Sequence, residues 1–208
     1  MSLVVAAWAI TASLFGAAGS ETPEPSFEGK PLGYWMTVLR EVPKDPARAS
    51  QDWRKAPWAV GKIGVPALPG LIDALDDESP QVRLRAIRPI LAMGALASDA
   101  APKLSSLLKD SDAGVRQWSA AALGQIGPAA AGATPALNAA LKDDEASVRQ
   151  AAAAALGGIG AHDSIPLLRE ATNDPNKAVQ RAARVAIERL EEKPRPPEGG
   201  DPSPAPAP

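Results

Sequence analysis

The chain has 208 residues, with 22 Lys+Arg against 24 Asp+Glu and a formal net charge of −2. It has no cysteine and one histidine, His162, which excludes disulfide frameworks, zinc knuckles, thiol nucleophiles and His-rich metal sites. The near-neutral charge argues against broad binding to a phosphate backbone, which needs clustered Lys and Arg.

Residues 1–20 are expected to be a signal peptide. Residues 2–18 are uncharged and apolar or small, and small residues continue to Ser20, which suits cleavage near residues 18–20. No Lys or Arg precedes the apolar run, so an uncleaved anchor or a misplaced start codon is the alternative. We expect export to the periplasm or beyond, with no membrane span in the mature chain, and a linker over residues 21–30.

The middle of the chain repeats with steps of 33, 33 and 31 residues. Each unit has a proline, an aspartate eight residues later, and a valine five residues after the aspartate. The residue after that valine is arginine in three units and Gln180 in the last. The proline column is Pro69, Pro102, Pro135 and Pro166, and the aspartate column is Asp77, Asp110, Asp143 and Asp174.

Each unit is predicted to be a pair of helices. Pro102 suits a helix start, because the first turn needs no backbone N–H from it. The apolar stripe of the first helix is Leu104, Leu107 and Leu108. One face of the second helix carries Val115, Ser119, Ala122, Leu123 and Ile126, and the helix is predicted to stop at Gly127.

A degenerate unit precedes these four. Residues 33–39 are predicted to be its first helix, residues 56–64 end its second helix, and residues 43–52 form a longer polar connection. We therefore expect five helix pairs in a domain over residues 31–192. Residues 193–208 are rich in proline and are expected to be a disordered tail.

The Pro…Asp…Val-Arg spacing with an Ala-Leu-Gly-x-Ile-Gly ending resembles the HEAT repeat, in the short bacterial form of the phycobilisome lyase-type repeat group. The resemblance implies an all-α, right-handed solenoid of about five helix pairs. In HEAT repeats the aspartate and arginine columns form a ladder between adjacent units. If this chain follows the family pattern, Asp77, Asp110, Asp143 and Asp174 would pair with Arg83, Arg116 and Arg149. Gln180 should weaken the ladder in the last unit.

The resemblance also places the second helices on the concave surface, so partner-binding residues are sought there. The candidates are Trp58, Arg85, Arg88 and Trp118, because Trp and Arg are favoured anchors at interfaces. The alternative for each tryptophan is that it fills a gap between units. We expect no catalytic residue, because the Asp and Arg columns recur in every unit, and His162 lies in a turn beside Asp163.

The resulting hypothesis is a non-catalytic scaffold that binds another protein and uses no cofactor or metal. One alternative is a phycobilin lyase-like or other small-ligand-binding accessory protein built on the same repeats. A second alternative is a DNA-binding HEAT-like protein. Residues 28–192 contain as many basic as acidic residues, which opposes the DNA-binding alternative.

Overall fold

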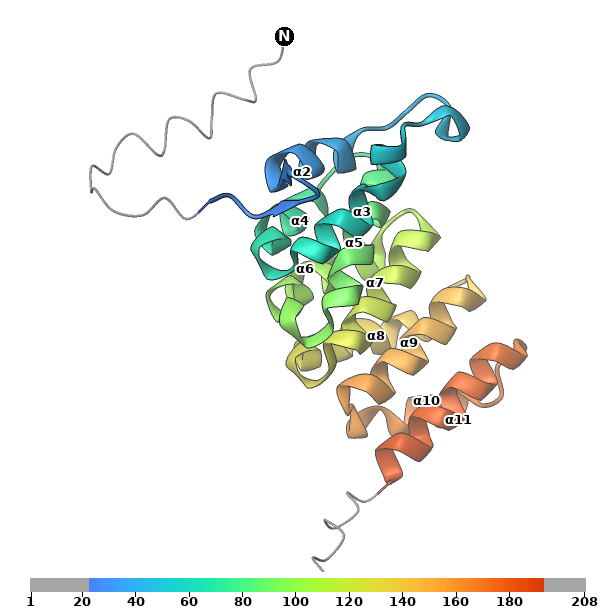
Figure 1. The fold of residues 1–208 in the computed structure, drawn as a ribbon. Coiled ribbons are helices and arrows are strands. Elements are labelled where there is room, and N and C mark those ends of the chain that lie inside the picture. The colour runs from blue at the N-terminus through green and yellow to red at the C-terminus, as the bar shows by residue number, and fades with distance from the viewer. Residues whose placement is uncertain (1–22, 193–208) are drawn as a thin grey trace, which may run out of the picture.

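The computed structural model describes residues 23–192, so the expected signal peptide and Pro-rich tail lie outside the described residues. Five helix pairs follow one another in chain order and form the expected α-solenoid (Figure 1). The first helices are α2 (Leu32–Arg40), α4 (Leu68–Ala74), α6 (Ala101–Ser106), α8 (Thr134–Ala140) and α10 (Ile165–Ala171). The second helices are α3 (Gln51–Ile63), α5 (Pro80–Met93), α7 (Ala113–Ile126), α9 (Ala146–Ile159) and α11 (Lys177–Glu191). Each second helix packs against the second helix of the next repeat.

Prolines and glycines set the helix bounds, as predicted. The proline column stands in the first turn of α4, α6, α8 and α10, where no intrahelical donor is lost. A glycine with positive φ ends each of the first four second helices, because glycine adopts this conformation without a Cβ clash. These glycines are Gly64, Gly94, Gly127 and Gly160. Short 3₁₀ segments then lead into the next repeat: η2 (Val65–Ala67), η3 (Gly94–Ala100), η5 (Gly127–Ala133) and η6 (His162–Ser164).

The core runs the length of the stack between the two rows of helices. Every residue predicted for the apolar stripes of the third repeat is buried, in α6, in the short η4 (Leu107–Lys109) that follows it, and in α7. Burying these stripes against the neighbouring repeats is what stabilises units too small to fold alone. In residues 23–192 no helix combines the length and the apolar character needed to cross a membrane.

Small residues bring α7, α9 and α11 into backbone contact. A Cβ placed on Gly158 would lie 2.6 Å from the Gly124 carbonyl oxygen, and one on Gly124 would lie 2.9 Å from the Ala155 Cα. A Cβ on Gly157 would lie 2.9 Å from the Ala186 Cα. These positions therefore require glycine for the observed spacing of the helices.

Three ion pairs link successive repeats. Arg83 Nη2 donates to the Asp110 carboxylate at 2.8 Å. Arg116 and Arg149 each donate two hydrogen bonds, from Nε and Nη2, to the carboxylate of the next aspartate. The partners of Arg116 and Arg149 are Asp143 and Asp174. These bidentate bonds lower the pKa of both carboxyls below the ordinary aspartate value.

The two ends of the ladder differ from its middle. Asp77 makes no ion pair among the described residues, although its carboxylate accepts the same hydrogen bond from a backbone N–H two residues on that the other three aspartates accept. Gln180 keeps one bond of the arginine pattern, from its side-chain amide to the Asp174 carbonyl oxygen at 2.7 Å. The joints between repeats are therefore strongest from the second repeat to the fifth.

The expectation of a linker over residues 21–30 is wrong for its second half. Strands β1 (Ser26–Phe27) and β2 (Lys30–Pro31) pair antiparallel and lie on the first helix pair. Trp35 is fully buried, and its indole N–H donates to the Phe27 carbonyl oxygen at 3.1 Å. The Phe27 ring packs edge-on against Trp58, with 5.0 Å between ring centroids. The hairpin therefore covers the end of the stack, which a polar spacer would leave open.

Candidate interaction surface

The exposed side of the second helices carries two hollows. We call this side, formed by α3, α5, α7, α9 and α11, the second-helix face. The N-terminal hollow, of about 540 Å³, lies between α3 and α5, and the C-terminal hollow, of about 590 Å³, lies across α7, α9 and α11. The face is thus concave at both ends of the stack.

Trp58 forms one wall of the N-terminal hollow. Its side chain is 51% exposed although it contacts Phe27 of the hairpin. The ammonium groups of Lys55 and Lys62 lie 5.7 and 5.6 Å from its ring centroid, within cation–π distance. The hairpin therefore holds one edge of the indole in place and leaves the rest open to a partner.

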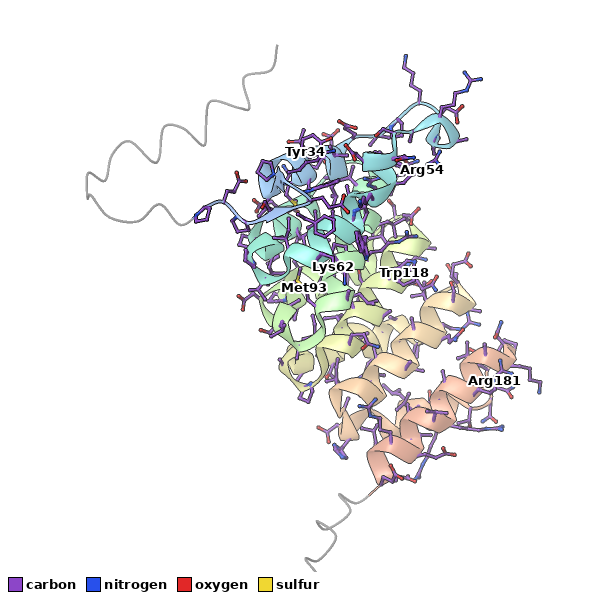
Figure 2. The ribbon with its side chains drawn as sticks, viewed as in Figure 1. Tyr34, Arg54, Lys62, Met93, Trp118 and Arg181 are labelled. Carbon is purple, nitrogen blue, oxygen red and sulfur yellow. The ribbon has the colours of Figure 1, made fainter. Side chains whose placement is uncertain are left out.

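Arg88 connects this hollow to the next helix. It lines the N-terminal hollow from α5, and its guanidinium lies 6.0 Å from the ring centroid of Trp118 on α7. Trp118 is 36% exposed, on the side of the molecule where Figure 2 also labels Arg54 and Lys62. The structure thus brings Trp58, Arg88 and Trp118 onto three consecutive second helices.

Arg85, the fourth candidate, does not belong to this surface. It is only 8% exposed, and its Nη2 donates to the Trp53 carbonyl oxygen at 2.7 Å and to that of Val38 at 3.3 Å. Its guanidinium also stacks on the Trp53 ring at 4.0 Å. Burial lowers the pKa of Arg85 to about 10, so it stays charged at neutral pH. Arg85 ties α5 to the first helix pair and is unavailable to a partner.

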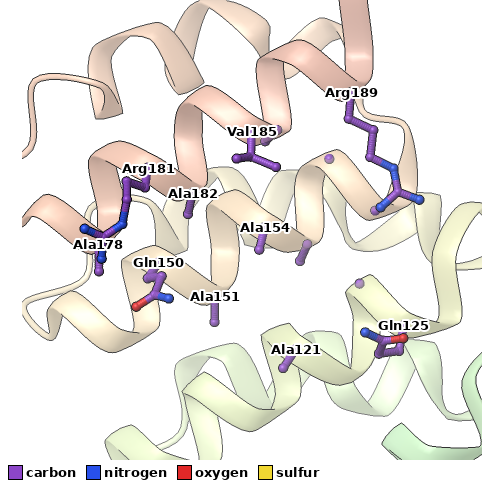
Figure 3. Close-up of a pocket in the computed structure, with 15 residues that line it drawn as sticks. Ala121, Gln125, Gln150, Ala151, Ala154, Ala178, Arg181, Ala182, Val185 and Arg189 are labelled. Carbon is purple, nitrogen blue, oxygen red and sulfur yellow. The ribbon is translucent and has the colours of Figure 1, made fainter. Parts of the chain in front are cut away.

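The C-terminal hollow has a floor of small residues, which sequence reasoning missed (Figure 3). Ala121, Ala151 and Ala154 form part of that floor, with Gln125 and Gln150 beside them. One signal could have revealed the hollow. In the repeat alignment the column of Trp118 continues as Ala151 and Ala182, so a large side chain is followed by two small ones.

The charged side chains that line the two hollows are all basic, although α3 and α11 also contain Asp52, Glu188 and Glu191. The charged residues that line the two hollows are Arg54, Lys62, Arg88, Arg181 and Arg189. Helices α5, α7 and α9 contain no aspartate or glutamate at all. Both hollows are therefore lined by cations although the chain as a whole has a net charge of −2.

The remaining polar candidates lie away from this face. His162 is exposed at the start of η6, and its Nδ1 lies 2.8 Å from the Gly160 carbonyl oxygen. Within residues 23–192 no group of three or more His, Asp and Glu side chains is placed to hold a metal ion.

Comparisons with known proteins bear on the repeats themselves. The family model for HEAT repeats matches residues 68–146 and 130–188. The chain belongs to the HEAT-repeat family. Among curated proteins, none matches the sequence of this HEAT-repeat protein.

Solved structures share its solenoid. The complex of CpcE and CpcF of phycocyanin lyase from Nostoc sp. PCC7120 is similar, with 26% identity and a TM-score of 0.63 over 86% of this chain and 71% of that one. A designed armadillo repeat protein in complex with the peptide (KR)4 is also similar, with 20% identity and a TM-score of 0.58 over 76% of this chain and 81% of that one. The second likeness concerns the fold alone.

Proposed function

We propose that this HEAT-repeat protein is a non-catalytic scaffold that is exported and binds a partner protein on its second-helix face. The alignment of Trp58, Arg88 and Trp118 on α3, α5 and α7 carries this proposal. Tryptophan and arginine contribute most of the binding energy in many protein interfaces. Here all three side chains are exposed, and Trp58 and Arg88 line a hollow that a partner side chain could fill.

The contacts of the other polar residues support a non-catalytic role. The arginines of the repeat columns are engaged by aspartates of the next repeat and by backbone carbonyls, so they have few donors left for a substrate. His162 is exposed, and its Nδ1 lies 2.8 Å from the Gly160 carbonyl oxygen of its own turn.

The test is affinity capture from an extract of the source organism with the wild-type chain and with Trp58→Ala and Arg88→Ala. We expect each substitution to reduce the recovered partner at least about tenfold, the loss typical of an interface anchor. Leu96→Ala is the matched control, because Leu96 is an exposed apolar residue in η3, outside the hollows.

Circular dichroism separates binding from folding in these variants. Helicity should be unchanged in all three, because each substituted side chain is exposed. A Trp58→Ala variant that loses helicity would show that Trp58 serves only to cap the first repeat. Equal amounts of partner recovered by the wild type and all variants would contradict the proposal that this face binds it.

A second candidate is a small-ligand-binding accessory protein, favoured by the similarity to the CpcE and CpcF complex of phycocyanin lyase. Both hollows fall in the size range of small-molecule pockets, which is about 300–1,000 Å³. Titration with a free bilin tests this candidate. A shifted absorption band in the wild type that Trp58→Ala abolishes would favour it over the scaffold.

A further inference from the structure

We infer that the segment bound on the second-helix face is an extended peptide of a partner protein, with acidic residues at its two ends and small or apolar residues between them. The inference rests on the proposed function and adds the chemical class of the ligand. It follows from three features of the face: the cations that line the two hollows, the lack of unpaired cations on α7 and α9, and the floor of small residues.

The cations that line the two hollows form no ion pair among the described residues. Across residues 23–192, the lysines and arginines that form ion pairs are the three ladder arginines and Lys30, Arg48, Lys55, Lys103 and Arg169. Arg88, Arg181 and Arg189 are in none of these pairs, although all three are exposed and line a hollow. A partner that supplies carboxylates at these positions would complement the field of the face.

The middle of the face offers no free charge. Arg116 is the only basic residue of α7 and Arg149 the only one of α9, and both are held in the ladder. What α7 and α9 present instead is Trp118, a floor of alanines, and the amides of Gln125 and Gln150. An amide side chain both donates and accepts, so it can bond to a peptide backbone that lies close to the small floor.

The spacing of the helices sets the length of the bound segment. Five second helices at about 8–10 Å between axes extend over about 32–40 Å. An extended chain rises about 3.3 Å per residue, so about 12 residues cross the whole face. A peptide of this length places one end over the cations of α3 and α5 that line the N-terminal hollow, its centre over α7 and α9, and its other end over Arg181 and Arg189 of α11.

This arrangement favours a peptide over a nucleic acid. Duplex DNA carries a negative charge every 1.7 Å or so along its axis, and a protein that binds it needs cations at matching density. The gap in free cations across α7 and α9 does not provide that density. A peptide can concentrate its carboxylates at the ends, where the arginines are.

The experiment is selection of random 12-residue peptides displayed on phage against the purified chain, followed by affinity measurement with a synthetic copy of the strongest binder. We expect the selected peptides to carry Asp or Glu at both ends and to bind more weakly as salt concentration rises. The double variant Arg88→Gln/Arg181→Gln should weaken the synthetic peptide at least about tenfold. The control Lys109→Gln/Lys142→Gln removes the same charge from exposed turns after the first helices and should change affinity less than about twofold.

The outcomes separate this inference from the proposed function. Peptides that depend on Trp58 and Arg88 but show no acidic enrichment overturn the inference and leave the scaffold standing. Binding indifferent to Trp58→Ala and Arg88→Ala contradicts the proposed face itself. A selection that returns no binder overturns the inference. Stronger binding of a 12-nucleotide oligo-dT, or of a synthetic peptide of residues 193–208, also overturns it and identifies a nucleic acid or the chain's own tail as the occupant.

Discussion

Arg149 performs two separable tasks with one side chain. Its Nη1 donates to the Asp143 carbonyl oxygen at 2.8 Å, which fixes the turn of its own repeat. Its Nε and Nη2 donate to the Asp174 carboxylate at 2.7 and 3.0 Å, which joins it to the next repeat. Gln180, in the same column, keeps the first task, and no further repeat follows it among the described residues. A glutamine is therefore the natural substitute for removing the joint alone.

Arg149→Gln should lower the free energy of unfolding by about 2 kcal/mol, because a charge-assisted, bidentate hydrogen bond is lost while the turn bond is kept. Urea denaturation at pH 7 measures the change. Arg169→Gln is the control, since the pair of Arg169 with Glu191 is exposed and should contribute less than about 1 kcal/mol. Equal losses in the two variants would contradict a special role for the ladder.

The difference between wild type and Arg149→Gln should disappear in acid. The hydrogen bonds from Arg149 hold the pKa of Asp174 below its ordinary value of about 3.9. A carboxyl with a lowered folded pKa stabilises the fold above its unfolded pKa, and this stability is lost as pH falls through the folded pKa. Denaturation curves between about pH 4 and pH 2 should therefore converge, and a gap that persists unchanged would contradict the assignment.

At the scale of helices, the close contact of α7, α9 and α11 shapes the C-terminal hollow. The helices meet through Gly124, Gly157 and Gly158, and the alanines beside these glycines leave no side chain to fill the space above. The same small residues thus fix the packing and create the floor of the hollow. A side chain added at the contact must push two backbones apart.

Gly158→Ala should lower the free energy of unfolding by about 1–3 kcal/mol, because the new Cβ would meet the Gly124 carbonyl oxygen and backbone atoms cannot rotate away. The loss should appear although alanine is a better helix former than glycine. Gly132→Ala is the matched control, because nothing lies within 4 Å of a Cβ at that position. Thermal and urea denaturation of both variants test the contact, and similar stabilities would refute it.

The features that the sequence predicts well are those that recur in every repeat. Three kinds of residue play the same structural role in several repeats: the prolines that start first helices, the glycines that end second helices, and the aspartates and arginines of the ladder. Their regular spacing is therefore visible in the sequence. The contacts of Arg85 and Phe27 occur once and join residues far apart in the chain. No period marks them, and the expectations for Arg85 and for the linker failed for that reason.

Taken as a whole molecule, the stack has two different ends. At the N-terminal end the hairpin, the buried Trp35 and the buried Arg85 close the first helix pair. At the C-terminal end α11 exposes Arg184, Val185 and Glu188 and has no following repeat among the described residues. In a solenoid each repeat is stabilised by its neighbours alone, so the less covered end opens first.

Hydrogen exchange should report this asymmetry. Amides of α10 and α11 should exchange at least about tenfold faster than those of α2 and α3, and those of α6 to α9 should exchange most slowly. Phe27→Ala should remove the difference by loosening the hairpin from Trp58 and the first helix pair. Uniform exchange along the wild-type stack would show that it opens as a single unit.

The ladder has a consequence for how such a chain changes through evolution. Each of its pairs joins residues 25 to 27 positions apart, so no joint reaches past the adjacent repeat. Excision of residues 110–142 would bring Arg83 and Asp143 to the spacing that Arg83 and Asp110 have now. Duplication of the same segment would add a repeat in the same way. The number of repeats, and with it the length of the second-helix face, is therefore free to vary while every joint keeps its chemistry.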